Sequence, residues 1–173
     1  MKVYDGTTTE SEPATRPERV KVGIAESKVA DGEAHLTTSG LGSCLGVAVY
    51  DPAAGVAGLV HAMLPSIDEM EGDNQAKFAD SGIRALVADM ERRGADRERM
   101  TAKLAGGSDM LDFSESGSGI GARNVETGRR TLAEFDIPVV GEDVGGDHGR
   151  SLRLETGSGD LVVKSANRDP ITL

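Results

Sequence analysis

Two side chains in the first half of the sequence could carry out nucleophilic chemistry together. Cys44 is the only cysteine of the chain, and His61 lies seventeen residues later, inside the next apolar run. A free thiol is only a few per cent thiolate at neutral pH, so it needs a neighbouring base to become a good nucleophile. An imidazole can take the thiol proton and later return it to a leaving group. The pair therefore suits catalysis through a covalent intermediate.

The segments around this pair predict a β-hairpin. Residues 44–51 and 56–64 are apolar runs of strand length, and the sequence Asp-Pro-Ala-Ala-Gly between them is a turn signal. Folding the chain about positions 52 and 53 makes Cys44 and His61 opposite or diagonal neighbours. Their Cβ atoms would then lie about 4.5 to 8 Å apart. We therefore expect the thiol and the imidazole to be within reach of each other.

The residues before the cysteine predict the remaining parts of a catalytic loop. Gly40 and Gly42 permit a sharp turn that aims backbone N–H groups inward, as an oxyanion hole requires. Gly42 and Ser43 are therefore the candidate oxyanion-loop residues. A hydroxyl from the Thr-Thr-Ser run at 37–39 could accept a hydrogen bond from one ring nitrogen and hold the imidazole.

Both side chains also have a purely structural interpretation. A lone cysteine beside Gly and Ser is commonly a small buried hydrophobe, and a lone histidine on an apolar strand is commonly a core residue. The hairpin that brings them together is the argument for chemistry, and on the residues alone both interpretations stay open. If the pair is catalytic, we expect the thiol pKa to lie below that of free cysteine.

The rest of the pattern predicts a single α+β domain, in which mixed or antiparallel β-sheets pack with two main helices as a layered sandwich. Apolar residues recur at helical spacing over 74–94 and 120–136. The expected strands cover 20–26, 32–40, 44–51, 56–64, 101–107, 138–146 and a hairpin over 151–165 that turns at 157–159. Residues 1–17 predict a disordered acidic tail, so the domain is expected over 18–173.

Composition limits the partners and the compartment. The net charge is −10, and nucleic acid and anionic lipid both need a basic footprint, so neither is expected as a partner. No apolar run approaches the roughly 18 to 20 residues that would span a bilayer, so we expect no membrane insertion and a cytoplasmic location. One cysteine cannot form an internal disulfide or supply a multi-cysteine zinc site. We expect no metal and no organic cofactor.

A glycine-rich segment offers a nucleotide-binding alternative. The sequence Gly-Ser-Gly-Ile-Gly-Ala at 117–122 matches a dinucleotide fingerprint, with Glu142 about twenty residues further on. That fingerprint requires a strand that ends immediately before the first glycine. Here the sequence Asp-Met-Leu-Asp-Phe-Ser-Glu-Ser lies between, so the context disfavours a nucleotide site.

Five further stretches occur in a fixed order along the chain: TSGLGSCLGVAVYDP, GLVHAMLP, AKLAGGSDM, IGARN and EDVGGDHGRS. Each motif alone has little specificity. Together, from about Val20 to Lys164, they resemble the CheD family of glutamine deamidases from bacterial and archaeal chemotaxis.

The resemblance implies an enzyme that hydrolyses the side-chain amide of particular glutamines on the cytoplasmic helices of chemoreceptors, giving glutamate and ammonia. It assigns the nucleophile to Cys44, the base and acid to His61, and the residue that orients the imidazole to Thr38. It implies no cofactor. It also implies binding to CheC, the phosphatase of a phosphorylated response regulator. The alternative function is a non-catalytic regulatory partner of that phosphatase.

Overall fold

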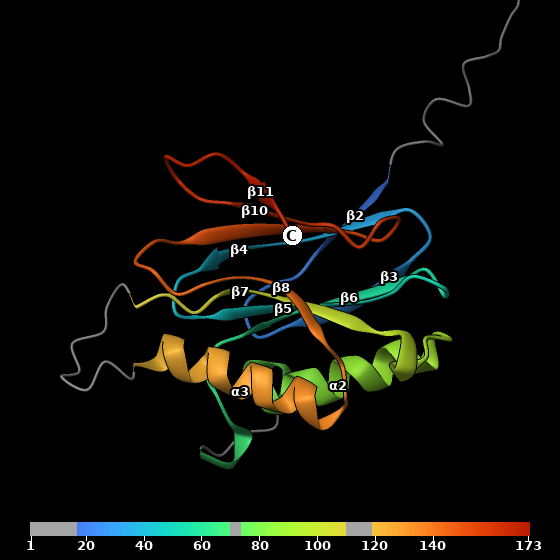
Figure 1. Cartoon of the computed structure of the whole chain (residues 1–173), viewed down its shortest axis with the longest axis horizontal. Helices are drawn as coiled ribbons and strands as arrows, with labels where there is room; N and C mark the ends of the chain where they lie inside the picture. The colour runs from blue at the N-terminus through green and yellow to red at the C-terminus, as the bar shows by residue number, and fades with distance from the viewer. Residues whose placement is uncertain (1–16, 70–73, 110–118) are drawn as a thin grey trace, which may run out of the picture.

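The computed structural model describes residues 17–69, 74–109 and 119–173, and Figure 1 shows their arrangement in three layers. Two five-stranded sheets pack face to face, and two helices cover the other face of the second sheet. The strands of the second sheet are therefore enclosed on both sides, which explains their nearly continuous apolar runs.

The first sheet has the strand order β11-β10-β9-β4-β2. Strand β2 pairs in parallel with β4, and the other neighbours are antiparallel. Its face toward the second sheet is apolar, and its opposite face is half-buried over β4 and β9. The strands are β2 (Glu18–Lys21), β4 (Ala34–Leu41), β9 (Arg150–Glu155), β10 (Leu161–Lys164) and β11 (Ile171–Thr172).

The second sheet has the order β3-β6-β5-β7-β8, with β7 and β8 parallel and the other pairs antiparallel. Every residue of β6 is buried. The strands are β3 (Ser27–Asp31), β5 (Leu45–Asp51), β6 (Val56–Ala62), β7 (Thr101–Gly106) and β8 (Val139–Val144).

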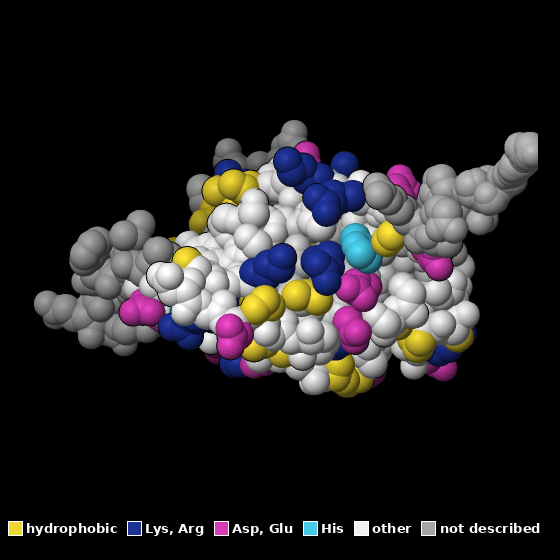
Figure 2. Space-filling view, turned by 90° about the horizontal axis from the view of Figure 1, so that it is seen from above, with side chains coloured by type: hydrophobic (Ala, Val, Ile, Leu, Met, Phe, Trp, Pro, Cys, Tyr) yellow, Lys and Arg dark blue, Asp and Glu magenta, His cyan; other side chains and the backbone are white. Residues whose placement is uncertain are grey.

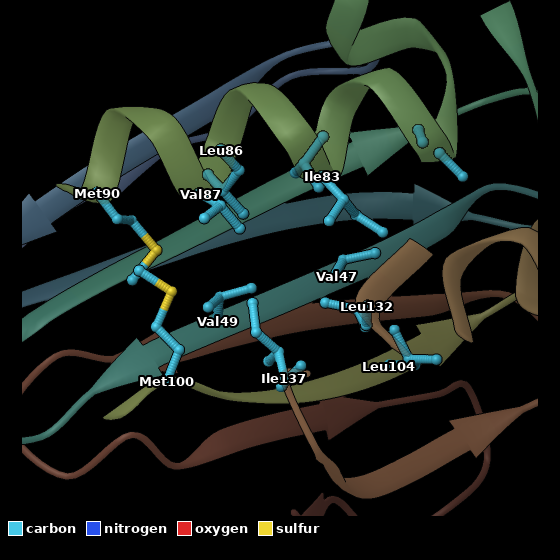
Figure 3. Close-up of a cluster of buried hydrophobic side chains, with 14 of the residues drawn as sticks. Val47, Val49, Ile83, Leu86, Val87, Met90, Met100, Leu104, Leu132 and Ile137 are labelled. Carbon is cyan, nitrogen blue, oxygen red and sulfur yellow. The ribbon is translucent and has the colours of Figure 1, made fainter. Parts of the chain in front are cut away.

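Two apolar clusters lie on the two faces of the second sheet. On the helix side, Val47 and Val49 of β5 pack beneath α2 (Ala79–Arg92) and α3 (Ile120–Glu134). Figure 3 shows this cluster, in which Ile83, Leu86, Val87 and Met90 descend from α2 onto the strands. On the other side, Ala48, Ala57 and Leu59 face the first sheet. Alternate residues of β5 and β6 therefore point to different layers.

The predicted single α+β domain with two main helices and mixed sheets is confirmed. The helix expected over 74–94 divides into a 3₁₀ turn, η3 (Gln75–Lys77), and α2. Gly94 follows the end of α2 with φ +97°, and its N–H donates to the carbonyl oxygen of Glu91. Two further 3₁₀ turns are η2 (Ile67–Glu69) and η4 (Arg97–Arg99).

One predicted strand is wrong. The alternating pattern over 20–26 predicted a continuous strand, but β2 ends at Lys21 and the chain then crosses to the other sheet. Ala25 adopts φ +62°, which is incompatible with an extended strand. Its N–H donates to the carbonyl oxygen of His61, and the N–H of His61 donates to that of Glu26. The crossing segment therefore holds the backbone on both sides of the imidazole.

The predicted acidic tail lies outside the described residues, apart from Pro17. Within the described ranges, no helix has the length and apolar character needed to span a membrane.

Candidate active site

The hairpin of β5 and β6 sets the relative positions of Cys44 and His61. Gly46 pairs with His61, and Leu45 pairs with Ala62. Continuing this register by one residue places position 44 opposite position 63, so His61 is the diagonal neighbour of Cys44. Both side chains have the same parity as the residues that face the first sheet, and Cys44 packs against that cluster. The predicted neighbour relationship is confirmed in its diagonal form.

The imidazole binds a hydroxyl from the facing sheet. Thr38 Oγ1 lies 2.7 Å from His61 Nδ1, and both side chains are buried. Thr38 points inward from β4, immediately before a bulge that lets the strand leave its regular pairing with β9. Of the three hydroxyl residues at 37–39, the structure therefore brings Thr38 to the imidazole.

The second ring nitrogen of His61 has no partner among the described residues, although it is buried. In the tautomer whose Nδ1–H donates to Thr38, Nε2 keeps its lone pair and can act as a base. Burial also lowers the pKa of His61, so the ring is neutral at neutral pH. An unpaired nitrogen in a buried site requires explanation, and a proton-transfer role supplies one.

The expected low thiol pKa is wrong in direction. Burial raises the pKa of the half-buried Cys44, and a hydrogen bond from its own backbone N–H lowers it by less. The sulfur packs against the apolar core between the sheets, and the neighbouring imidazole is neutral, so no positive charge stabilises a thiolate. The resting pair is a neutral thiol beside a neutral imidazole.

The backbone of the loop at 42–44 is fixed by its carbonyl groups. These three successive carbonyl oxygens accept hydrogen bonds from the backbone N–H of Ser108, the side-chain amide of Asn124 and the backbone N–H of Gly107, at 2.9, 2.8 and 2.8 Å in that order. The donors come from the two residues that follow β7 and from α3. The loop is therefore anchored to the end of the second sheet and to one of its covering helices.

The N–H groups of the same loop divide into two kinds. The N–H of Gly42 donates to the carbonyl oxygen of Gly40 at 3.2 Å. The N–H of Ser43 has no acceptor in the part of the chain that the structure describes, and that of Cys44 contacts only the sulfur of its own side chain. N–H groups beside the thiol suit an oxyanion, which needs donors already aimed at the place where negative charge develops.

Asn124 is a site residue that sequence reasoning missed. It lies on α3 and is fully buried, and its Nδ2 donates to the carbonyl oxygens of Ser43 (2.8 Å) and Met63 (3.1 Å). These carbonyls belong to the residue before Cys44 and to the residue opposite it in the hairpin. One side chain therefore bridges both strands at the thiol. The available signal was its place in the motif IGARN.

Close backbone contacts explain the glycines of two motifs. Gly106 has φ +108°, and a Cβ there would overlap the carbonyl oxygen of Cys44. A Cβ at Gly121, at the start of α3, would overlap the carbonyl oxygen of Ser108. These glycines let the end of β7 and the helix approach the loop closely enough to form the anchoring hydrogen bonds.

Arg150 is a second residue near the loop at 42–44 that sequence reasoning did not predict. Its buried guanidinium donates to Asp143 Oδ2 and to the carbonyl oxygen of Gly145, both at 2.9 Å, and to the carbonyl oxygen of Gly106 at 3.3 Å. A planar guanidinium can serve several acceptors at once. Arg150 therefore fixes the ends of β7 and β8 next to the loop.

Two further kinds of site, for a nucleotide and for a metal, were not expected from the sequence. Positions 117 and 118 of the glycine-rich segment lie outside them, while β7 ends at Gly106 and α3 begins only at Ile120. No group of three or more His, Cys, Asp or Glu side chains that could hold a metal occurs in the described ranges.

The fold and the site together define a layered α+β protein with a thiol–imidazole–hydroxyl cluster between its two sheets. The family model "CheD chemotactic sensory transduction" matches residues 63–165. The chain belongs to the CheD family.

Three relatives span most of the chain. The "Probable chemoreceptor glutamine deamidase CheD" of Haloarcula marismortui is 62% identical over 173 residues, which cover 100% of both chains. The protein of the same name from Natronomonas pharaonis is 45% identical, over 90% of this chain and 93% of its own length. That from Caldanaerobacter subterraneus is 43% identical, over 84% and 92%. The solved structure of Neisseria meningitidis protein NMB0706 is more distant (TM-score 0.49, 16% identity, 79% of this chain and 65% of that chain).

Proposed function

We propose that this chain is a chemoreceptor glutamine deamidase that uses Cys44 as its nucleophile. Relatives carrying that activity in their names support the reaction and the substrate class. The observation that carries the residue assignment is the 2.7 Å contact between Thr38 and His61, which leaves a buried, unpaired Nε2 on the ring beside Cys44. A core histidine with no further role would have both nitrogens satisfied.

Catalysis begins from the neutral pair. The sulfur of Cys44 attacks Cδ of the glutamine side chain as Nε2 of His61 takes the thiol proton, so thiolate forms only at the moment of attack. The carbonyl oxygen becomes an oxyanion, which accepts hydrogen bonds from the N–H groups of Ser43 and Cys44. Thr38 accepts from Nδ1–H and keeps the ring oriented as it becomes an imidazolium.

The intermediate then collapses and is hydrolysed. Nε2–H of His61 protonates the leaving nitrogen, the C–N bond breaks, ammonia departs, and a thioester on Cys44 remains. A water molecule gives a proton to Nε2 and adds to the thioester carbon. The C–S bond breaks, the imidazolium returns the proton to sulfur, and the product acid gives its own proton to solvent as it leaves as glutamate. No oxidant, metal or organic cofactor takes part in these steps.

Mass spectrometry of a chemoreceptor cytoplasmic fragment tests this function. Each deamidation replaces an NH₂ group by OH and adds about one dalton, and Cys44→Ala provides the inactive control because it lacks the atom that forms the thioester. A fragment whose mass is unchanged by the wild-type protein, but which binds to it, would favour the non-catalytic alternative.

We also propose that the protein works in the cytoplasm and that its substrate glutamines lie in the cytoplasmic helices of the receptor. CheC is the proposed binding partner. Membership of the CheD family supports them. We expect the phosphatase and the receptor to use overlapping surfaces around the loop at 42–44, because that loop carries the reactive groups which a receptor-like helix would cover.

A further inference from the structure

A pocket of about 600 Å³ lies on the outer face of the first sheet, and Thr38 forms part of its wall. Neither Cys44 nor His61 lines it, so it is a surface beside the catalytic pair and separate from it. Its described lining contains four basic residues and no acidic one, although the chain has 29 acidic and 19 basic residues. The basic residues of this basic pocket are Arg19, Lys21, Arg153 and Lys164.

Strand register explains how these residues come to share one face. Lys21 pairs with Thr37, Thr37 pairs with Arg153, and Arg153 pairs with Val162. Residues in register on adjacent strands point to the same side, and neighbouring strands lie about 4.8 Å apart. A row of side chains therefore crosses four strands, with a threonine between two cations. Lys164 lies two residues beyond Val162 and so on the same face.

The cations of this face are mostly uncompensated. Arg153 binds Glu155 at 3.1 Å, whereas Arg19, Lys21 and Lys164 are exposed and form no ion pair within the described ranges. Figure 2 looks onto this face and shows dark-blue Lys and Arg side chains gathered on it. On a protein of net charge −10, unpaired cations gathered on one face favour a negatively charged partner.

We infer that the basic pocket docks an acidic segment of the chemoreceptor substrate next to the glutamine that is modified. The inference rests on the proposed function and extends it by naming the surface and the chemistry that select the substrate. The side chain of Thr38 points to the inner face of β4, toward His61, so the pocket and the catalytic cluster lie on opposite faces of this strand. Ser39 and Gly40, which lead into the loop at 42–44, also line the pocket, so a segment held there can continue to that loop.

A protein segment fits this pocket better than nucleic acid does. The chain as a whole repels a polyanion, and the described lining includes no aromatic side chain on which a base could stack. The lining does include Val162 and the exposed Ile24, which can contact the apolar face of a helix. Contact pairs between basic and acidic side chains would then set the register of that helix.

The double variant Lys21→Glu/Lys164→Glu tests the inference. Its matched control, Lys28→Glu/Arg130→Glu, makes the same change in net charge at two exposed positions outside the pocket. Each double substitution is made in two backgrounds. The wild-type background is used for deamidation kinetics, and the Cys44→Ala background is used to measure binding to a fluorescently labelled receptor fragment. The buffer is the lowest salt concentration at which circular dichroism shows every variant folded.

We expect the pocket variant to raise KM and the Kd for the fragment about tenfold, while kcat stays within about twofold. The control pair stays close to its parent. The difference shrinks as salt rises, because the screening length falls from about 10 Å at 0.1 M to about 3 Å at 1 M.

Three results would overturn the docking surface: unchanged binding in the pocket variant, an equal loss in the control pair, or equal competition by single-stranded DNA of the same charge. A fragment that binds through the pocket but is never deamidated by the wild type would refute the proposed function and still support the docking surface.

Discussion

Thr38 Oγ1 and His61 Nδ1 lie 2.7 Å apart, although they belong to different β-sheets. Thr38 comes from the inner face of β4, and His61 comes from the enclosed strand β6. The contact therefore couples the orientation of the imidazole to the packing of one sheet on the other. A site built across a packed interface holds its groups rigidly, because closely packed layers resist small displacements.

Substitution of the three residues should reduce deamidation to unequal extents. Cys44→Ala removes the atom that forms the thioester, so activity should be abolished. His61→Ala removes both the base and the acid and should cost on the order of 100- to 10,000-fold. Thr38→Ala removes an orienting hydrogen bond and should cost about tenfold, whereas Thr38→Ser keeps the hydroxyl and should retain most of the rate.

Rates should be measured on one receptor fragment with variants whose folding is checked by circular dichroism. His35→Ala is a suitable control for His61→Ala, because it removes an imidazole from the half-buried outer face of β4. Near-wild-type activity in folded His61→Ala would show that His61 is a structural core residue and not the catalytic base.

The pH dependence of kcat/KM should follow the lowered pKa of His61. Burial disfavours the charged ring, so the imidazole stays neutral and able to accept the thiol proton below its ordinary pKa of about 6.5. The acidic limb of the pH profile should therefore lie below that value. An acidic limb above pH 7 would contradict the assignment of His61 as the base.

The free energy of unfolding should also fall as the pH is lowered, so it must be measured over the same pH range as kcat/KM. The unfolded chain takes up a proton on this histidine at a higher pH than the folded chain does. The stability that neutral His61 contributes is therefore present above about pH 6.5 and is lost as the pH falls through the lowered folded pKa. Thermal unfolding at each pH separates this loss from the protonation of an intact site.

Alkylation of Cys44 should report a raised thiol pKa. Burial disfavours the thiolate, so the rate of iodoacetamide labelling in the folded chain should rise at a higher pH than in the urea-unfolded chain. Mass spectrometry gives the labelled fraction at each pH. If folded Cys44 reacted at lower pH than the unfolded thiol, a thiolate–imidazolium pair would replace the neutral pair proposed above.

Local patterns in the sequence sufficed for the hairpin, because a turn signal and the two-residue period of strands fix which side chains are neighbours. They left Thr37, Thr38 and Ser39 as candidates, since the choice depends on which face of β4 meets the other sheet. The thiol pKa was predicted in the wrong direction because burial comes from a core assembled by distant segments. Asn124 lies 81 residues from its partner Ser43, beyond any local pattern.

CheC in excess should slow deamidation of the receptor fragment. If the phosphatase and the receptor share the surface around the loop at 42–44, each excludes the other, and the effect should appear mainly as a raised apparent KM. Cys44→Ala should still bind CheC, because it keeps the backbone of the loop and loses only a sulfur. Titration of CheC into the mass assay measures the effect, and a deamidation rate independent of CheC would refute a shared surface.

Asn124 should affect the rate of the chemical step more than substrate binding. Asn124→Asp keeps the size of the side chain but replaces the donor Nδ2 by an oxygen that faces the carbonyl oxygens of Ser43 and Met63. The hydrogen bonds that join the two hairpin strands beside Cys44 are then lost, and the carbonyl oxygens of Ser43 and Met63 remain without this buried donor. We expect kcat to fall about 10- to 100-fold with KM nearly unchanged, because small displacements of reacting groups are costly.

A loss of stability must be distinguished from a loss of positioning. Removing two hydrogen bonds and leaving two carbonyl oxygens facing a buried carboxyl oxygen should lower the free energy of unfolding by at least about 2 kcal/mol. Ile83→Val on α2 is a matched control, because it costs about 0.5 to 1.5 kcal/mol in the helix-side core without touching the loop. The control should keep its kcat at temperatures where both variants are folded. If Asn124→Asp keeps a wild-type kcat there, or if Ile83→Val loses as much, the bridge contributes only to stability and Asn124 does not position Cys44.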